Sequence, residues 1–321
     1  MQTRNLHRLA AATLLVHVGV IVWGAYVRVS FSGDGCGDHW PLCNGEAIPT
    51  AATTKTLIEY SHRFTSGIAV LLAIALFVFS RHREKWVKIA ASLALLFDFG
   101  EAVIGMLLVK WQLVAHNPSI KRAVSGSLHL VNTFFLLAAL AAAVWWTRYA
   151  PTKDALRRDQ KTIRLLSVLS PVLVILVAMS GAVAAFGDTI YRVSTLEEAI
   201  RADFSGVSNI LIQLRILHPV LAVIGASILW TLSTLVRSGS GSFEPKSSKR
   251  IRAFAFAVPV LYLSQLALGA LNVVLLAPGW LQLLHLFFAQ VLWITLVWWL
   301  LDLNVRTEDR DNTNRLGTSE P

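Results

Sequence analysis

The sequence predicts an all-α integral membrane protein with eight transmembrane helices, arranged as two tandem, pseudo-symmetric four-helix bundles. Of the 321 residues, 55% are hydrophobic and 15% are charged, whereas soluble domains carry about a quarter charged residues. The charges cluster between apolar runs, each long enough to cross about 30 Å of hydrocarbon. In addition, short motifs recur at a nearly constant offset along the chain. These three observations carry the fold prediction.

The apolar runs divide the chain into two halves of four spans each. The predicted spans are residues 9–28, 62–80, 86–109, 123–146, 164–186, 207–236, 251–277 and 279–303. We expect an N-terminal half at 1–146, a polar linker at 147–163, a C-terminal half at 164–303 and a polar tail at 304–321. The first run lacks the small-residue cleavage site of a signal peptide, so we expect it to be retained as a helix.

Basic residues are concentrated in alternate connections between the spans. Because loops rich in Lys and Arg remain on the cytoplasmic side, both termini are expected in the cytoplasm. The basic segments are the N-terminus, 81–88, 148–164, 237–252 and 306–315. This bias accounts for the net charge of +10. It favours contact with anionic lipid and gives no indication of nucleic-acid binding.

Four motifs of the first half recur in the second half at offsets of 156 to 164 residues. The matched residues are Gly24 and Gly181, His62 and His218, Glu101 and Gln265, and His129 and His285. Because each unit has an even number of helices, both units keep the same orientation in the bilayer. The pattern predicts a parallel repeat about an axis along the membrane normal.

Each half carries one matched histidine on its second span and one on its fourth, toward the outer ends. Two imidazoles that face each other inside a four-helix bundle are suitable axial ligands for a six-coordinate haem iron. The sequence therefore predicts one haem between His62 and His129 and another between His218 and His285. The spacing alone leaves three alternatives open: copper or zinc ligation, proton relay and a packing role.

The residue three positions before the first histidine differs between the halves. Glu59 precedes His62 in the first half, and Arg215 precedes His218 in the second. A carboxylate beside a haem can move protons during an oxidation, although an acid near a helix start also interacts favourably with the helix dipole. Arg215, and Arg63 next to His62, are candidate contacts for haem propionates. We therefore expect chemistry in the first half and electron transfer in the second.

Asp98 and Glu101 lie roughly halfway along the third predicted span. Acids at this depth are costly unless they face protein or water. The sequence leaves two roles open for them, a proton relay and acceptance of hydrogen bonds from a neighbouring helix.

Cys36 and Cys43 are the only cysteines, and both lie in the outer loop at 29–60. A pair seven positions apart in an oxidising compartment predicts a disulfide bond. A structural role and a redox role beside the first haem both remain open, because an exposed disulfide is reducible.

The cysteine loop and the segment that follows it resemble the signature of the haem A synthase family. The resemblance rests on Gly33-x-Gly35-Cys36-x3-Trp40-Pro41-Leu42-Cys43-x-Gly45 and on Glu59-x2-His62-Arg63, and it extends over all eight spans. The sequence departs from the family pattern at three points. Pro219 stands where the family often has arginine, residues 187–206 lack the second cysteine pair that some members carry, and Glu101 stands where we would expect glutamine.

The resemblance implies oxidation of a methyl group of haem O to the formyl group of haem A. It places the substrate haem O between His62 and His129 and a resident haem b between His218 and His285, with Glu59 as the essential acid. It further implies a bacterial inner membrane, a haem O synthase (farnesyltransferase), an electron donor and haem-copper oxidase assembly factors as partners. The alternative is a dihaem b-type electron-transfer protein, for which Glu59 and the cysteine loop have no obvious use.

Overall fold

The computed structural model describes residues 2–156, 161–205, 209–238 and 245–310, and within them eight helical segments are long and apolar enough to span a membrane. In the first half these are α1 (Thr3–Val29), α2 (Thr54–Ser80), α3 (Lys85–Lys110) and α4 (Ile120–Arg148). The second half contributes α5 (Lys161–Ile190), α8 (Leu217–Arg237), α9 (Pro245–Val274) and α10 (Gly279–Asn304). The predicted all-α, eight-span membrane fold is confirmed.

The sixth span has an irregular start. It begins with α7 (Ile210–Gln213), continues through the 3-10 turn η1 (Leu214–Ile216) and becomes regular only in α8. Pro219 lies in the first turn of α8 and has no N–H to donate to the carbonyl of Arg215. Proline is tolerated in the first turn of a helix, so Pro219 agrees with a regular helix that begins next to His218.

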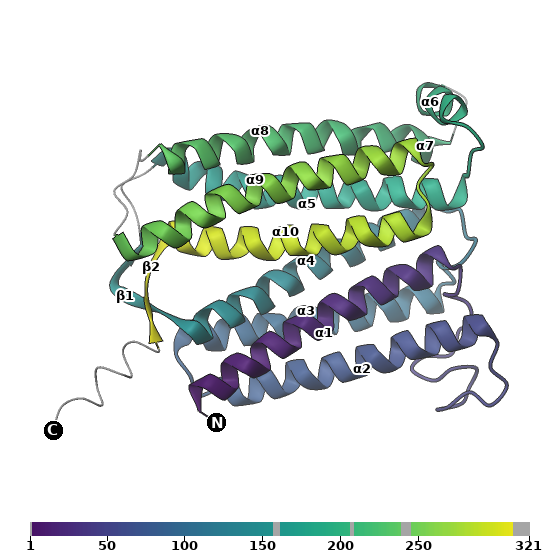
Figure 1. Cartoon of the computed structure of the whole chain (residues 1–321). Helices are drawn as coiled ribbons and strands as arrows, with labels where there is room; N and C mark the ends of the chain where they lie inside the picture. Colours follow the sequence, from purple (N-terminus) through teal and green to yellow (C-terminus); the bar gives the residue numbers. More distant parts are fainter. Residues whose placement is uncertain (1, 157–160, 206–208, 239–244, 311–321) are drawn as a thin grey trace.

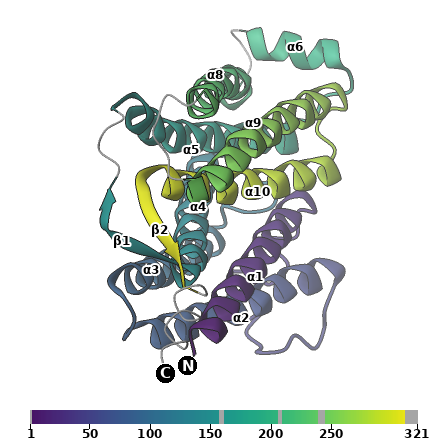
Figure 2. The same cartoon turned by 60° about the vertical axis from the view of Figure 1, so that its left-hand side comes forward.

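The two halves form two layers (Figures 1 and 2). Helices α1 to α4 pack on one another in one layer, and α5, α8, α9 and α10 form the other. The layers meet where α4 packs against α5 and α10, and the indole nitrogen of Trp293 in α10 donates to the Phe134 carbonyl of α4 at 2.7 Å. Near the outer end, Arg28 of α1 reaches across to Thr189 of α5 at 2.8 Å and Gln282 of α10 at 2.9 Å. The repeat symmetry of the halves itself stays a prediction.

A small sheet closes the end of the bundle where α1 begins. Strand β1 (Tyr149–Leu156) pairs antiparallel with β2 (Val305–Asp309), so that Tyr149 lies opposite Asp309. The sequence predicted a polar linker at 147–163 and a polar tail at 304–321. In the structure, β1 at the start of the linker pairs with β2 at the start of the tail. Residues 157–160 and 311–321 lie outside the described residues.

The opposite end of the bundle carries the outer loop that follows α1 and the short helix α6 (Leu196–Phe204) (Figure 1). Thr195 caps α6 by accepting from the Glu198 N–H at 3.1 Å, and Glu198 in turn accepts from the Ser194 N–H at 2.9 Å. This reciprocal capping explains why a short segment is helical. The four matched histidines lie toward this end of their helices.

Candidate functional site: two facing histidine pairs

The second histidine pair has a spacing that suits one metal ion between its rings. His218 of α8 and His285 of α10 have ring centres 6.4 Å apart, with perpendicular ring planes. A bond from an imidazole nitrogen to a metal is about 2 Å long, so two rings on opposite sides of one ion have centres roughly 6 Å apart. The observed spacing therefore fits axial ligation from both sides.

Hydrogen bonding orients His218 for this role. Its Nδ1 lies 3.0 Å from the carbonyl oxygen of Val177, and because a carbonyl only accepts, Nδ1 carries the proton. The hydroxyl of Ser180 is 3.3 Å from the same nitrogen. Nε2 is left deprotonated and free to bind a metal, which is the usual arrangement of a metal-binding histidine.

The first pair is oriented differently. His62 of α2 and His129 of α4 are near enough to interact electrostatically. Glu101 of α3 places Oε2 3.2 Å from Nδ1 of His129, outside the geometry of a hydrogen bond. The same carboxylate accepts from Asn132 at 2.6 Å and Thr133 at 3.1 Å. Of the two roles left open for Glu101, the structure confirms acceptance of hydrogen bonds from a neighbouring helix.

Gln265, the predicted counterpart of Glu101, contacts the histidine of the second half at a different atom. Its amide nitrogen donates to the backbone carbonyl of His285 at 3.2 Å and leaves the ring alone. The ring nitrogen Nδ1 of His285 is buried without a partner, as is Nδ1 of His62. In the described part of the chain, a carboxylate therefore lies against a matched histidine ring in the first half and not in the second.

Two glycines make room for the histidine rings. A Cβ at Gly24 of α1 would lie 2.9 Å from Cε1 of His62, and a Cβ at Gly181 of α5 would lie 2.8 Å from Cε1 of His218. Real Cβ atoms essentially never approach other atoms this closely, so a larger residue would displace the ring. The recurring Gly24 and Gly181 of the sequence thus correspond to the same contact in both halves.

The side chains present fit haem better than a bare metal ion. Within the described segments, no group of three or more His, Cys, Asp or Glu side chains could hold a metal. Protein sites for zinc use about four ligands, or three and a water, whereas a haem iron brings its equatorial ligands and needs only axial ones. Two facing imidazoles with free Nε2 atoms meet that requirement. The two histidine pairs are therefore proposed below to ligate haem.

Glu59 is buried beside the first pair and holds the cysteine loop. Its side chain accepts from the Cys36 N–H at 2.9 Å and from Arg63 at 2.5 Å, and the residue is only 3% exposed. It lies beyond the first turn of α2, so interaction with the helix dipole does not account for it. The carboxylate is one turn from His62 on the same helix, where it can exchange a proton with a group bound between the histidines.

Arg63 connects Glu59 to the loop between the cysteines. Besides Glu59, it donates to the carbonyl oxygens of His39 at 2.5 Å and Leu42 at 2.6 Å. The contact of Arg63 with a haem propionate stays a prediction. A propionate would have to share the Arg63 guanidinium with these two loop carbonyls. The sequence did not reveal this second role because it depends on the path of the loop.

The predicted disulfide between Cys36 and Cys43 is confirmed. Both residues are buried, at 0% and 1% exposure, because the loop folds back on the start of α2. Gly35 permits this contact, since a Cβ there would lie 2.5 Å from the Lys55 backbone. The burial favours the structural role over the redox role, which needs an accessible bond.

Arg215 has two carboxylate partners. It donates to Asp188 at 2.7 Å and to Asp203 at 2.7 and 2.9 Å. These contacts tie the 3-10 turn before α8 to the end of α5 and to α6, and they fix the approach to His218. Its predicted contact with a propionate stays a prediction.

A buried pair that the sequence interpretation missed lies deeper in the first half. Nδ1 of His17 is 2.7 Å from the Thr13 carbonyl and must carry a proton, while Nε2 is 3.3 Å from Oδ1 of Asp98. That second contact needs one further proton, on either the ring or the carboxyl. The pair therefore holds a shared proton and is neutral overall, which lowers the cost of burying it. The signal available was that both residues lie near the middle of their spans.

These features define a class of protein: a multi-pass membrane protein of two helical layers, with a facing pair of histidines in the second layer and two histidines at the matched positions of the first. The family described as COX15-CtaA, cytochrome oxidase assembly protein, matches residues 7–297. The chain belongs to this family.

Individual relatives agree with the family. The chain is 39% identical over 305 residues to a protein of Thermus thermophilus named "Protoheme IX farnesyltransferase", covering 92% of this chain and 48% of that protein. The chain thus spans about half the length of that relative. It is 48% identical over 97 residues to "Heme A synthase" of an Exiguobacterium species, covering 29% of this chain and 32% of the relative. It is 42% identical over 111 residues to "Heme A synthase" of Bacillus mycoides, covering 34% and 36%.

Proposed function

We propose that this chain is a haem A synthase, which oxidises a methyl group of haem O to the formyl group of haem A for a haem-copper oxidase. The observation that carries the proposal is the buried carboxylate of Glu59, one helical turn from His62, in a family of cytochrome oxidase assembly proteins. Relatives named for this activity support it. A simple electron carrier has no use for a buried acid and a covalently closed loop at this position.

The two halves have separate roles in this proposal. His62 and His129 bind the substrate haem O, and His218 and His285 bind a resident haem b, which supplies one-electron redox chemistry. The Glu101 carboxylate lies 3.2 Å from Nδ1 of His129, and the Val177 carbonyl accepts a hydrogen bond from Nδ1 of His218. Arg63 and Arg215 stand near the propionate side of each haem.

Glu59 accepts the protons that the oxidation of a methyl group releases. The Cys36 N–H and Arg63 hold its two oxygens in place, so the carboxylate keeps one orientation through the reaction. The disulfide keeps the Cys36 N–H where Glu59 needs it. The cysteine loop therefore acts as a positioning element for the acid.

The proposed setting is a bacterial cell membrane with both termini in the cytoplasm, as the distribution of basic residues indicates. The Thermus relative, of which this chain matches 48%, is named as a protohaem IX farnesyltransferase. A farnesyltransferase that makes haem O is therefore the proposed partner that supplies the substrate. Haem-copper oxidase assembly factors and an electron donor complete the expected partners.

The test is haem extraction and chromatography after expression in cells that make haem O. We expect haem A with the wild type, and haem O or a hydroxylated intermediate with Glu59→Gln. Glu46→Gln is the matched control, because Glu46 lies in the same loop and, among the residues that the structure describes, its side chain hydrogen-bonds to Thr50 alone. Wild-type protein that contains only haem b, despite a confirmed supply of haem O, would favour the electron carrier.

A further inference from the structure

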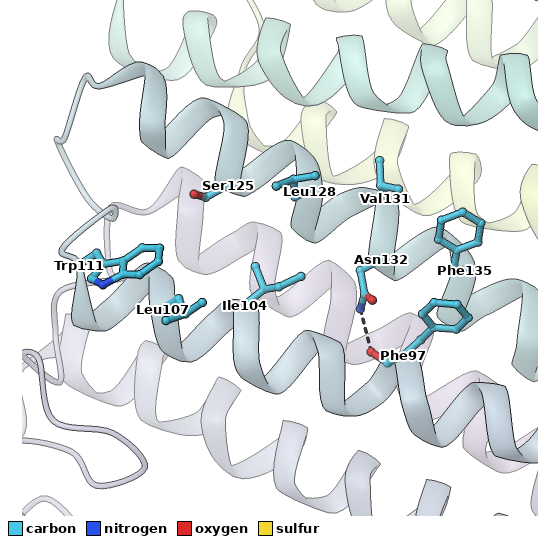
Figure 3. Close-up of a pocket in the computed structure, with 9 residues that line it drawn as sticks. All are labelled: Phe97, Ile104, Leu107, Trp111, Ser125, Leu128, Val131, Asn132 and Phe135. Carbon is cyan, nitrogen blue, oxygen red and sulfur yellow. Dashed lines mark hydrogen bonds between the residues drawn. The ribbon is translucent and has the colours of Figure 1, made fainter.

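A hollow runs between α3 and α4 on a surface that faces the membrane (Figure 3). Its volume is about 440 Å³. Phe97, Ile104 and Leu107 of α3 form one wall, and Leu128 and Phe135 of α4 form the other. We refer to it as the α3–α4 groove. Leu128 is 56% exposed and Phe135 is 41% exposed, so the groove opens directly into the bilayer.

One of the polar side chains of the groove, Asn132, leads to the first histidine pair. The amide nitrogen of Asn132 donates to the Phe97 carbonyl at 2.7 Å (Figure 3) and to Oε1 of Glu101 at 2.6 Å. The other oxygen of Glu101 lies 3.2 Å from Nδ1 of His129. A single amide and a single carboxylate therefore separate the groove from a proposed ligand of the substrate haem.

The position of Asn132 is built into the packing of the two helices. A Cβ at Gly100 of α3 would lie 2.6 Å from Oδ1 of Asn132. The glycine thus allows the amide to lie between the helices, where it lines the groove. The remaining lining is apolar apart from Ser125 near the outer end.

We propose that the α3–α4 groove binds the farnesyl chain of haem O while the porphyrin lies between His62 and His129. This inference rests on the proposed function. The groove extends along α3 from Phe97 to Trp111, which is about 21 Å at 1.5 Å per residue. That length accommodates an extended isoprenoid chain of three units, and the volume is in the range of sites for small ligands.

The chemistry of the groove explains how such a substrate is admitted. An isoprenoid chain gains little from the hydrophobic effect on moving from lipid into an apolar groove, because lipid tails are equally apolar. Its contribution to haem O binding therefore comes from close van der Waals packing against the groove walls. The chain can therefore stay in the membrane phase while the porphyrin enters the bundle. Selectivity comes from close packing along the walls and from the proximity of the groove to His129. An ordinary lipid chain fits the walls as well but has no group to place between the histidines.

The test compares haem O with protohaem, which lacks the farnesyl chain. Full-length protein carrying haem in its second half is titrated with a further equivalent of each haem, and the absorbance change gives two dissociation constants. Ile104→Trp fills the groove, and Val103→Trp is the matched control, since Val103 is the next residue, 49% exposed and outside the groove. Leu128→Trp and Val124→Trp repeat the comparison from α4.

We expect Ile104→Trp and Leu128→Trp to weaken haem O binding at least tenfold and to leave protohaem binding within twofold of wild type. Both control variants should bind both haems as the wild type does. Unchanged haem O binding in the two groove variants, as expected for a groove that holds only lipid, would overturn the proposal. Equal weakening of both haems would also overturn it, because the effect would then lie in the histidine pair.

The outcome is separable from the proposed function. If the wild type forms haem A and the groove variants bind haem O normally, the groove assignment is wrong and the function stands. If the wild type binds haem O in the predicted manner but never converts it, the function is wrong and the groove stands.

Discussion

Substitution of Gly181 by alanine tests the contact that positions His218. The added Cβ would lie 2.8 Å from Cε1 and 3.1 Å from Nδ1 of the ring. Ordinary van der Waals contact begins near 3.4 Å, so the ring must retreat by about half an ångström, while a metal site tolerates errors of about 0.2 Å in its distances. The same movement strains the hydrogen bond from Nδ1 to the Val177 carbonyl.

The expected cost is that of overpacking, about 1–3 kcal/mol, borne mainly by the axial ligation. We predict that Gly181→Ala loses haem b from the second half, or converts it from a six-coordinate to a five-coordinate absorption spectrum, while the helical content stays unchanged. Gly24→Ala should likewise weaken haem O binding through His62.

Gly19→Ala is the matched control, because Gly19 lies on the same helix as Gly24 and a Cβ there meets nothing within 4 Å. It should leave both haem sites unchanged and stabilise α1 slightly, since alanine is the better helix former. If Gly19→Ala and Gly24→Ala alter haem binding equally, the proposed contact does not position the ring.

Three further predictions concern charged residues. Asp98→Leu should lower the free energy of unfolding by about 1–3 kcal/mol relative to Asp98→Asn, because only the leucine leaves Nε2 of His17 without its partner; unfolding in a denaturing detergent measures it, and equal stabilities would contradict it. Arg310 lowers the pKa of Glu84 through paired hydrogen bonds, so this contact stabilises the fold above the ordinary glutamate pKa and is lost as the pH falls through the lowered value. Glu84→Gln should remove that pH dependence at a cost below about 1 kcal/mol, and an unchanged stability-against-pH curve would refute the assignment. Asp302→Ala should destabilise the fold by about 2 kcal/mol, because its arginine partner at the start of α9 would lose a paired contact; a neutral result in the same unfolding assay would exclude that role.

The membrane fold was predictable because composition alone separates apolar spans from charged connections. The recurrence of the four histidines at one offset also predicted which histidines form each pair, because each pair takes one histidine from each of two helices in the same half. The sequence showed Gly24 and Gly181 as a repeated motif, but it did not show that they lie against the histidine rings. Its meaning depends on which face of one helix meets the next.

Features that depend on tertiary packing were not predictable. The sheet of β1 and β2 pairs segments about 150 residues apart, and neither has a strong strand pattern of its own. The contacts of Arg63 with the loop carbonyls require the loop to fold back on α2, which no local pattern indicates. The pairing of His17 with Asp98 required knowledge that α1 and α3 approach each other at that depth.

The most direct test of the account is the haem content of His62→Ala and His218→Ala, purified from cells that make haem O. We predict that His218→Ala loses haem b, and that His62→Ala keeps haem b but neither retains haem O nor forms haem A. If His62→Ala still forms haem A, or if the two variants lose the same haem, the division of labour between the two histidine pairs is wrong.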